Sequence, residues 1–511
     1  MKALHTNKLS INRSLKKTLS KSFASKKGKG IDPNLTEFDI LFVGGLHSAN
    51  MIKYYQNLHF HGTMAGCNTK AKFYHEHLYE YMISGNMKSY KYLAMPFSSN
   101  FETGEARHLK DRIVSINPSQ NEATNEKGVI LKYKSLVINT GLDHRVENHP
   151  YLHKHVINDD FGKSRVFVHQ TNDSYHCQRN ARIFQMHKDG DFIVYLPNYP
   201  SKREAADSWY LALDSYFARG VHSEALGRSM KVRVITPNNE LFKFPFANEI
   251  VLDEISQRTT IETHFGWELI NIEVTHHLNR STRYAYFRHV TTGEEMRLDF
   301  GTFLTTPESK PREIFLGNDL ANNKGLVTVN PYTLQHVKYP NVFAFGDCID
   351  IPTTKGLYAT LNQGVVLRNN LWDYLHGNEF KAIYEGYTSF VVHHSIDRIW
   401  MFKHRYEYEP TAWNFYLPRF LGIFGFKLKN SLEKNYLSKI FQKKPNFGYP
   451  YLSKNRYFRP LNENNYLQKH NIPLSKILIH PYHQPELSFS HHEHNHHHEH
   501  NHTPEHLTHS T

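Results

Sequence analysis

The sequence contains no apolar run of the roughly 18 residues that a simple membrane-spanning helix requires. It has only three cysteines, Cys67, Cys177 and Cys348, which lie far apart and form no CxxC pair. This spacing predicts no disulfide framework and fits a reducing compartment. Acidic residues are missing from the first 31 positions, which carry nine lysines and arginines.

The basic N-terminal segment, residues 1–31, also has interleaved serines and apolar residues that could share one face of a helix. This composition is typical of a mitochondrial presequence. A disordered basic tail or a nucleic-acid-binding arm is the alternative. We favour the presequence because every one of its compositional criteria is met.

The overall composition is that of a folded protein with a positive charge. A chain of 511 residues is long enough for two or three domains. Its apolar content of 39% excludes wholesale disorder. The net charge of +13 favours anionic partners. Phospholipid head groups are preferred over nucleic acid, because the sequence has no RNA-binding signature and no zinc-finger spacing.

Short apolar runs predict a set of strands that end in turns. The expected strands are 38–43, 131–138, 191–196, 232–236, 301–306 and 342–345, and the expected helices include 51–55 and 205–219. The order predicts an α/β fold, and the family resemblance described below implies two Rossmann-like dinucleotide-binding domains, the first split around an inserted second one. Both domains should be parallel sheets flanked by helices.

The strand at 342–345 stops at Gly346 and places one carboxylate, Asp347, at a strand end. Ligands of open α/β sheets sit at the carboxyl ends of the strands. A purely structural role is the alternative: Asp347 would cap the helix that begins near Lys355.

The residues around this aspartate look like those of the sulfide:quinone oxidoreductases, in the flavoprotein disulfide-reductase superfamily. The resemblance runs from about 38 to 428 and rests on motifs in the right order: 197–200, 209–217, 327–330, 333–336, 341–348, 352–355, Gln363 and 387–389. It implies an FAD site and identifies these cofactor-binding candidates: Gly44, Gly45, Thr140, Gly141, Gly346, Asp347 and Lys355.

The chain departs from this family at its redox centre. Active members use two cysteines, because only thiolates combine nucleophilicity with disulfide exchange. The matching positions are Arg203 and Phe390, and neither can form a disulfide or a flavin adduct. We expect that the family mechanism is lost and that no catalytic residue remains.

The flavin site also departs from the family pattern. The GxGxxG positions read Gly44 to Ala49, with Leu46 where the second glycine should let the backbone approach the pyrophosphate. The acidic residue that grips the ribose aligns with Cys67 or Asn68. Losing hydrogen bonds to one charged group costs about 1.5–3 kcal/mol. We therefore expect FAD binding to be weak or absent.

No other cofactor is expected. The stretch 237–241, which follows the strand at 232–236, contains no glycine, so NAD binding is not predicted. The terminal histidines imply no fixed metal geometry, and no metal is expected.

The sequence divides into seven segments. They are a presequence-like segment (1–31), the first part of the flavin-type domain (38–145), a second Rossmann-like domain (146–306), the second part of the flavin-type domain (307–378), a C-terminal quinone- and membrane-proximal region (379–430), an extended tail (431–490) and a His-rich tail (491–511). Residues 416–428 resemble the family's membrane-associating region.

The favoured function is a non-catalytic accessory subunit of a mitochondrial inner-membrane assembly, such as a respiratory-chain complex. It would sit peripherally on the matrix side, with protein subunits and the membrane surface as partners and no nucleic acid. The alternatives are an FAD-dependent quinone oxidoreductase with an altered electron donor and a membrane-surface or RNA-associated binding protein.

Overall fold

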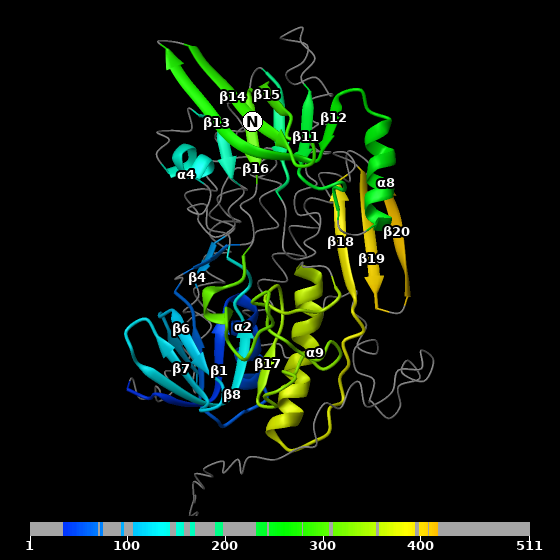
Figure 1. Ribbon diagram of the computed structural model, residues 1–511. Helices are drawn as coiled ribbons and strands as arrows, with labels where there is room; N and C mark the ends of the chain where they lie inside the picture. The colour runs from blue at the N-terminus through cyan, green and yellow to red at the C-terminus, as the bar shows by residue number, and fades with distance from the viewer. Residues whose placement is uncertain are drawn as a thin grey trace, which may run out of the picture.

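The computed structural model describes the residues that form two sheet domains and a third small sheet (Figure 1). The described residues are 34–69, 72–74, 94–96, 106–143, 150–157, 164–168, 190–197, 231–242, 245–277, 280–305, 310–353, 357–393, 398–406 and 408–416. The predicted helix 205–219, the N-terminal segment and both tails lie outside them.

The first sheet is built around strand β8. The order is β5 (Ala106–Leu109), β2 (Met64–Cys67), β1 (Glu37–Gly44), β8 (Ile130–Asn139), β7 (Glu122–Asn125) and β6 (Ile113–Asn117), and β17 (Val342–Ala344) also pairs with β8. Strands β5, β2, β1, β8 and β17 run parallel. The expected strands 38–43, 131–138 and 342–345 are confirmed.

The prediction of purely parallel sheets was wrong for this domain, because β6, β7 and β8 pair antiparallel. Tight turns cause this arrangement. Asn121 (φ 55°) joins β6 to β7, and Gly128 (φ 79°) lies between β7 and β8. Connections this short can join antiparallel neighbours but not parallel ones.

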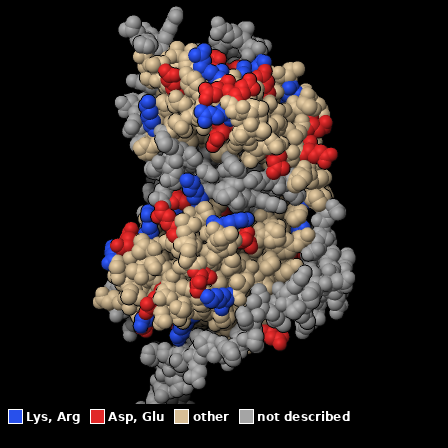
Figure 2. Space-filling model, viewed as in Figure 1, with Lys and Arg blue, Asp and Glu red and all other residues tan. Residues whose placement is uncertain are grey.

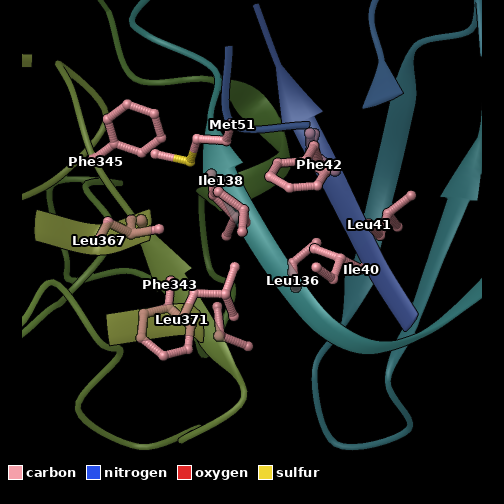
Figure 3. Close-up of a cluster of buried hydrophobic side chains, with 14 of the residues drawn as sticks. Ile40, Leu41, Phe42, Met51, Leu136, Ile138, Phe343, Phe345, Leu367 and Leu371 are labelled. Carbon is pink, nitrogen blue, oxygen red and sulfur yellow. The ribbon is translucent and has the colours of Figure 1, made fainter. Parts of the chain in front are cut away.

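Helices α2 (Leu46–Asn57) and α9 (Leu357–Leu375) pack beside this sheet and close its core. Consecutive residues of β1 are fully buried, as expected for a strand covered on both faces. Figure 3 shows Phe343 of β17 beside Leu371 of α9, and Phe345 beside Met51 of α2, within this core. Burying each such side chain stabilises the fold by about 1.5–3 kcal/mol.

The second sheet is parallel throughout. Its order is β12 (Ile261–Phe265), β11 (Val232–Thr236), β10 (Phe192–Tyr195), β16 (Thr302–Thr305) and β9 (Val166–Val168). The expected strands at 191–196, 232–236 and 301–306 are confirmed. Helix α8 (Pro245–Ser256) packs on one face. On the other lie α4 (Pro150–Ile157) and the antiparallel strands β13 (Trp267–His277), β14 (Arg280–His289) and β15 (Glu295–Asp299).

A third sheet, which sequence reasoning missed, follows α9. Strands β18 (Thr388–His393), β19 (Arg398–Arg405) and β20 (Tyr408–Tyr416) pair antiparallel beside α8 (Figure 1). Val392 and Phe402 join the core formed by α8 and the second sheet. Within the region 379–430, residues 388–393, 398–405 and 408–416 therefore form a sheet.

The remaining described elements are short: the strand pair β3 (Lys72–Tyr74) and β4 (Ala94–Pro96), and the 3-10 helix η6 (Glu313–Phe315). Residues 417–428 lie outside the described ranges. Within those ranges, no helix is both long and apolar enough to cross a membrane.

The two chain connections between the sheet domains lie side by side. Asp143 and Lys310 form an antiparallel bridge in which each backbone N–H donates to the other's carbonyl, at 2.6 and 2.8 Å. The guanidinium of Arg312 lies 3.7 Å from the Asp143 carboxylate. These contacts tie the exit from the first domain to the return into it.

Candidate functional site

The predicted cofactor residues of the first domain converge at the carboxyl edge of its sheet. Gly44 is in register with Asn139, and Ala344 is in register with Ile138. The turns that follow β1, β8 and β17 are consequently neighbours. This places Gly44–Gly45, Thr140–Gly141 and Gly346–Asp347 along one edge.

Glycine is required at two of these positions by close backbone approach. Gly44 has φ 139°, and a Cβ there would lie 2.0 Å from the Asn139 carbonyl oxygen. Gly346 has φ 84°, and a Cβ would lie 2.6 Å from Asn139 Nδ2. Any side chain at either position would force this edge of the sheet apart.

Asn139 links the three turns and was not predicted as a site residue. Its carbonyl accepts the N–H of Gly45 at 3.3 Å, and its side-chain Nδ2 donates to the Phe345 carbonyl at 2.9 Å. The residue is only 8% exposed. The signal in the sequence was a polar residue directly after the apolar run 136–138.

Gln363 of helix α9 holds the turn before Asp347. Its Oε1 accepts the N–H of Gly346 at 2.8 Å, and its Nε2 donates to the Tyr384 hydroxyl at 3.4 Å. The glutamine of the predicted motif thus has a clear structural role. It also means that the Gly346 N–H is used within the chain and does not face a ligand.

The carboxylate of Asp347 is half-buried at the strand end. It makes no hydrogen bond or ion pair in the part of the chain that the structure describes, so capping of a helix by this side chain is not observed. Helix α9 begins at Leu357, and Lys355 lies outside the described residues. The aspartate oxygens therefore remain available to a hydroxyl donor such as the ribityl chain of a flavin.

The start of helix α2 is the place where a dinucleotide pyrophosphate would lie. Its N-cap is Gly45, with no side-chain cap and no acidic residue in the first turn. The ring of His47 meets the ring of Phe345 edge-on, with centroids 6.2 Å apart. Figure 3 shows Phe345 against Met51 of the same helix. Aromatic and apolar side chains therefore line the gap between α2 and the end of β17.

The end of β2, where a ribose-binding acid is expected, carries no charge. Cys67 is buried, and burial raises the pKa of its thiol well above the usual range. The backbone N–H of Asn68 donates to the Leu109 carbonyl at 3.0 Å. The Asp111 carboxylate, whose charge also acts on the Cys67 thiol, is paired with Lys127 at 2.5 Å. These residues do not fit the ribose end of FAD.

The remaining cysteines are poorly placed for redox chemistry. Cys348 is 2% exposed, and its Sγ donates to the Phe345 carbonyl at 3.4 Å. Cys67 and Cys348 are both free thiols, and Cys177 lies outside the described residues. A thiol buried in an apolar core stays protonated and is inert as a nucleophile.

The two positions that replace the family's cysteines are only partly described. Phe390 lies in β18 opposite Phe402 of β19, and Arg203 falls outside the described residues. Among the described residues, no group of three or more His, Cys, Asp and Glu is arranged to hold a metal ion.

The sheet topology changes which turn of the second domain is expected to bind a nucleotide. Strand β10 lies between β11 and β16, the place of the first strand in a Rossmann sheet. The phosphate-binding turn would therefore follow β10, at Leu196–Pro197, and not the strand at 232–236 that the sequence analysis used. Proline there has no N–H to offer a phosphate.

No protein-family model matches the chain. Curated mitochondrial sulfide:quinone oxidoreductases are similar to it. The Schizosaccharomyces pombe protein is 24% identical over 311 residues, which cover 58% of this chain and 62% of that protein. The Dictyostelium discoideum protein is 26% identical over 335 residues, covering 63% and 69%. The match thus spans less than two thirds of the S. pombe relative.

Solved structures share the fold. A chain in the Tetrahymena thermophila mitochondrial ATP synthase structure aligns with a TM-score of 0.70 at 20% identity, covering 81% of this chain and 98% of that one. The Aquifex aeolicus sulfide:quinone oxidoreductase aligns with a TM-score of 0.59 at 14% identity, covering 80% and 92%. These matches confirm the resemblance to sulfide:quinone oxidoreductases and the two-domain dinucleotide-binding fold.

Proposed function

We propose that this chain, a relative of the mitochondrial sulfide:quinone oxidoreductases, is a non-catalytic accessory subunit of a mitochondrial inner-membrane assembly. The observation that carries the proposal is that the chain has no cysteine at the family's two redox positions. Both family cysteine positions hold other residues, Arg203 and Phe390, and the two described cysteines are buried. No described residue supplies the nucleophile that the family's reaction needs.

Weak or absent FAD binding is part of this proposal. Leu46 replaces a glycine of the pyrophosphate turn, and Gln363 takes up the N–H of Gly346. Neither Cys67 nor Asn68 offers the ribose a carboxylate. The packing of β17 against β8 and α9 accounts for the apolar residues of the 341–348 motif.

Membership of a large assembly is supported by the similar chain in the Tetrahymena ATP synthase, which is aligned over nearly its whole length. A rotary ATP synthase is therefore a better candidate host than the respiratory-chain complex named from sequence. The basic segment 1–31 supports import into mitochondria. We propose a peripheral position on the matrix side of the inner membrane.

One observation favours the alternative, an FAD-dependent quinone oxidoreductase with an altered electron donor. The Asp347 carboxylate has no partner among the described residues, so structure alone does not explain its presence. A flavin ribityl chain would supply the missing donors.

An activity assay separates the two proposals. The purified chain is supplied with FAD, sulfide and a ubiquinone analogue, with an active sulfide:quinone oxidoreductase as positive control. We expect no sulfide-dependent quinone reduction. Sulfide-dependent turnover would refute the accessory role. FAD-dependent turnover with another donor that Asp347→Asn abolishes would establish the alternative.

A further inference from the structure

Helices α2 and α9 pack against each other through aromatic side chains at the core of the first domain. Tyr55 stacks on Trp372 with ring centroids 6.0 Å apart and an interplanar angle of 11°. The Tyr55 hydroxyl donates to the Arg368 carbonyl at 2.7 Å. These contacts fix the position of Arg368 relative to α2.

The guanidinium of Arg368 is held against a second tyrosine. Its central carbon lies 4.1 Å from the centroid of the Tyr54 ring, a cation–π contact. The Tyr54 hydroxyl donates to Asn369 Oδ1 at 3.4 Å, and Asn369 Nδ2 donates to the Val365 carbonyl at 2.6 Å. The ring and the guanidinium are therefore positioned by a chain of contacts.

Arg368 is a buried cation with no carboxylate partner among the described residues. The residue is only 8% exposed, and its Nε is sealed from solvent with no acceptor. Within the described residues, its guanidinium makes no hydrogen bond and no ion pair. Burial lowers its pKa, and the only other groups that act on that pKa are Tyr54 and Tyr55. A buried charge without a partner is costly to the fold.

Other partly buried arginines of this chain do have carboxylate partners. Arg233 pairs with Asp191 at 2.8 Å, Arg258 with Glu254 at 3.3 Å and Arg405 with Glu385 at 3.3 Å. Arg368 is more buried than any of these, yet the carboxylate is missing. The contrast indicates that its counter-ion comes from outside the described chain.

We propose that Arg368, stacked on Tyr54 between α2 and α9, is the centre of a binding site for a single oxyanion of the carboxylate or phosphate class. The planar guanidinium suits such oxygens because its donors form a rigid fork. Nε has no acceptor of its own, so the anion completes the hydrogen bonding of the group. The site is separate from the carboxyl edge of the sheet and does not depend on the proposed function.

Calorimetry with the purified full chain tests this site. Inorganic phosphate and acetate are titrated separately at constant ionic strength set with chloride, into the parent chain, Arg368→Met and Arg258→Met. We expect saturable binding by the parent and by Arg258→Met, with affinity about tenfold or more weaker in Arg368→Met. A response to phosphate alone indicates a phosphate ligand, and a response to acetate alone indicates an acidic side chain or terminus of a partner.

Two results would overturn the proposal. One is equal binding by the parent and Arg368→Met, which would show a general response of a basic chain to anions. The other is no saturable binding of either anion. If Arg368→Met does not fold, Arg368→Lys replaces it, because lysine keeps the positive charge but lacks the planar, forked donors of the guanidinium. Unchanged anion affinity in Arg368→Lys would count against the site.

Discussion

His336 is a buried histidine whose hydrogen bonds fix both its tautomer and its charge. Its Nδ1 accepts the N–H groups of Lys338 and Tyr339, each at 3.0 Å, so the ring proton sits on Nε2, which donates to the Leu320 carbonyl at 3.1 Å. Burial lowers its pKa to about 4 from about 6.5. The imidazole is therefore neutral in the folded chain at pH 7.

This shift makes stability depend on pH. Between pH 6.5 and 4, His336 binds a proton in the unfolded chain but not in the folded chain. The stabilisation of the folded state by neutral His336 is therefore complete above pH 6.5 and is lost as the pH falls toward 4. The loss amounts to about 3 kcal/mol at most. His336→Asn, which keeps an acceptor for the backbone N–H groups, should flatten the slope of unfolding free energy by about one proton. Urea titrations across this range measure the slope, and an unchanged slope would contradict the prediction.

Cys67 and Cys348 should resist thiol reagents in the native protein, because both are buried and free. A disulfide-exchange reagent added to the native Cys177→Ser variant is expected to modify no thiol, and the same variant in denaturant is expected to yield two. Rapid modification of either cysteine in the folded variant would show an accessible thiol and weaken the case against redox chemistry.

At the scale of the elements, the turns at the sheet edge depend on glycine for two separable reasons. Gly346 and Gly128 have nearly the same left-handed φ, 84° and 79°, yet a Cβ at Gly346 would clash with Asn139 while one at Gly128 meets nothing within 4 Å. Gly128→Ala should therefore cost about 1–2 kcal/mol of unfolding free energy from backbone strain alone.

Gly346→Ala should lose a further 1–3 kcal/mol or so, because the Asn139 amide must move away from the new methyl group. Chemical denaturation of the two variants gives the difference directly. Equal losses would mean that this edge of the sheet is looser than the contacts of Asn139 indicate.

Six strands of the two larger sheets, β1, β8, β17, β10, β11 and β16, could be predicted from the sequence, because apolar runs that end in turn residues such as Gly44, Asn139 and Gly346 mark buried strands. The other strands of these sheets were not predicted. The antiparallel strands β13–β15 and β18–β20 could not be predicted either. In β15 half-exposed and exposed residues alternate, so no apolar run marks the strand, and in β19 the apolar run 399–402 is only four residues long and is flanked by charged residues. Such short runs do not distinguish a strand from other buried segments. Asn139 emerges as central only when the fold brings residues more than 200 positions apart together, as in its contact with Phe345.

At the scale of the whole molecule, the positive charge is unevenly distributed along the chain. Nine basic residues and no acidic ones lie in residues 1–31. On the face shown in Figure 2, Lys and Arg are interspersed with Asp and Glu over the described part of the surface. The folded body thus presents mixed charge there, and removal of a presequence would take away most of the net charge of +13.

The paired connections at Asp143 and Lys310 should couple the two sheet domains. Arg312→Ala removes the guanidinium 3.7 Å from the Asp143 carboxylate, which is itself buried. Losing this contact to a buried carboxylate is expected to cost about 1–3 kcal/mol. Differential scanning calorimetry of the variant should show a lower unfolding temperature. The control is the surface variant Arg288→Ala, which loses an exposed ion pair with Glu295 and should leave the unfolding temperature almost unchanged. Equal behaviour of the two variants would contradict the coupling.

The most direct test of a non-catalytic subunit is the flavin content of the native protein. Mitochondrial membranes are solubilised gently, the assembly that contains this chain is isolated, and its visible absorbance is recorded before and after the chain is separated under mild conditions. We predict that the chain migrates only within a large complex and that no flavin separates with it. A free chain carrying about one flavin per polypeptide would contradict this conclusion. It would indicate a flavoenzyme whose electron donor is still to be identified.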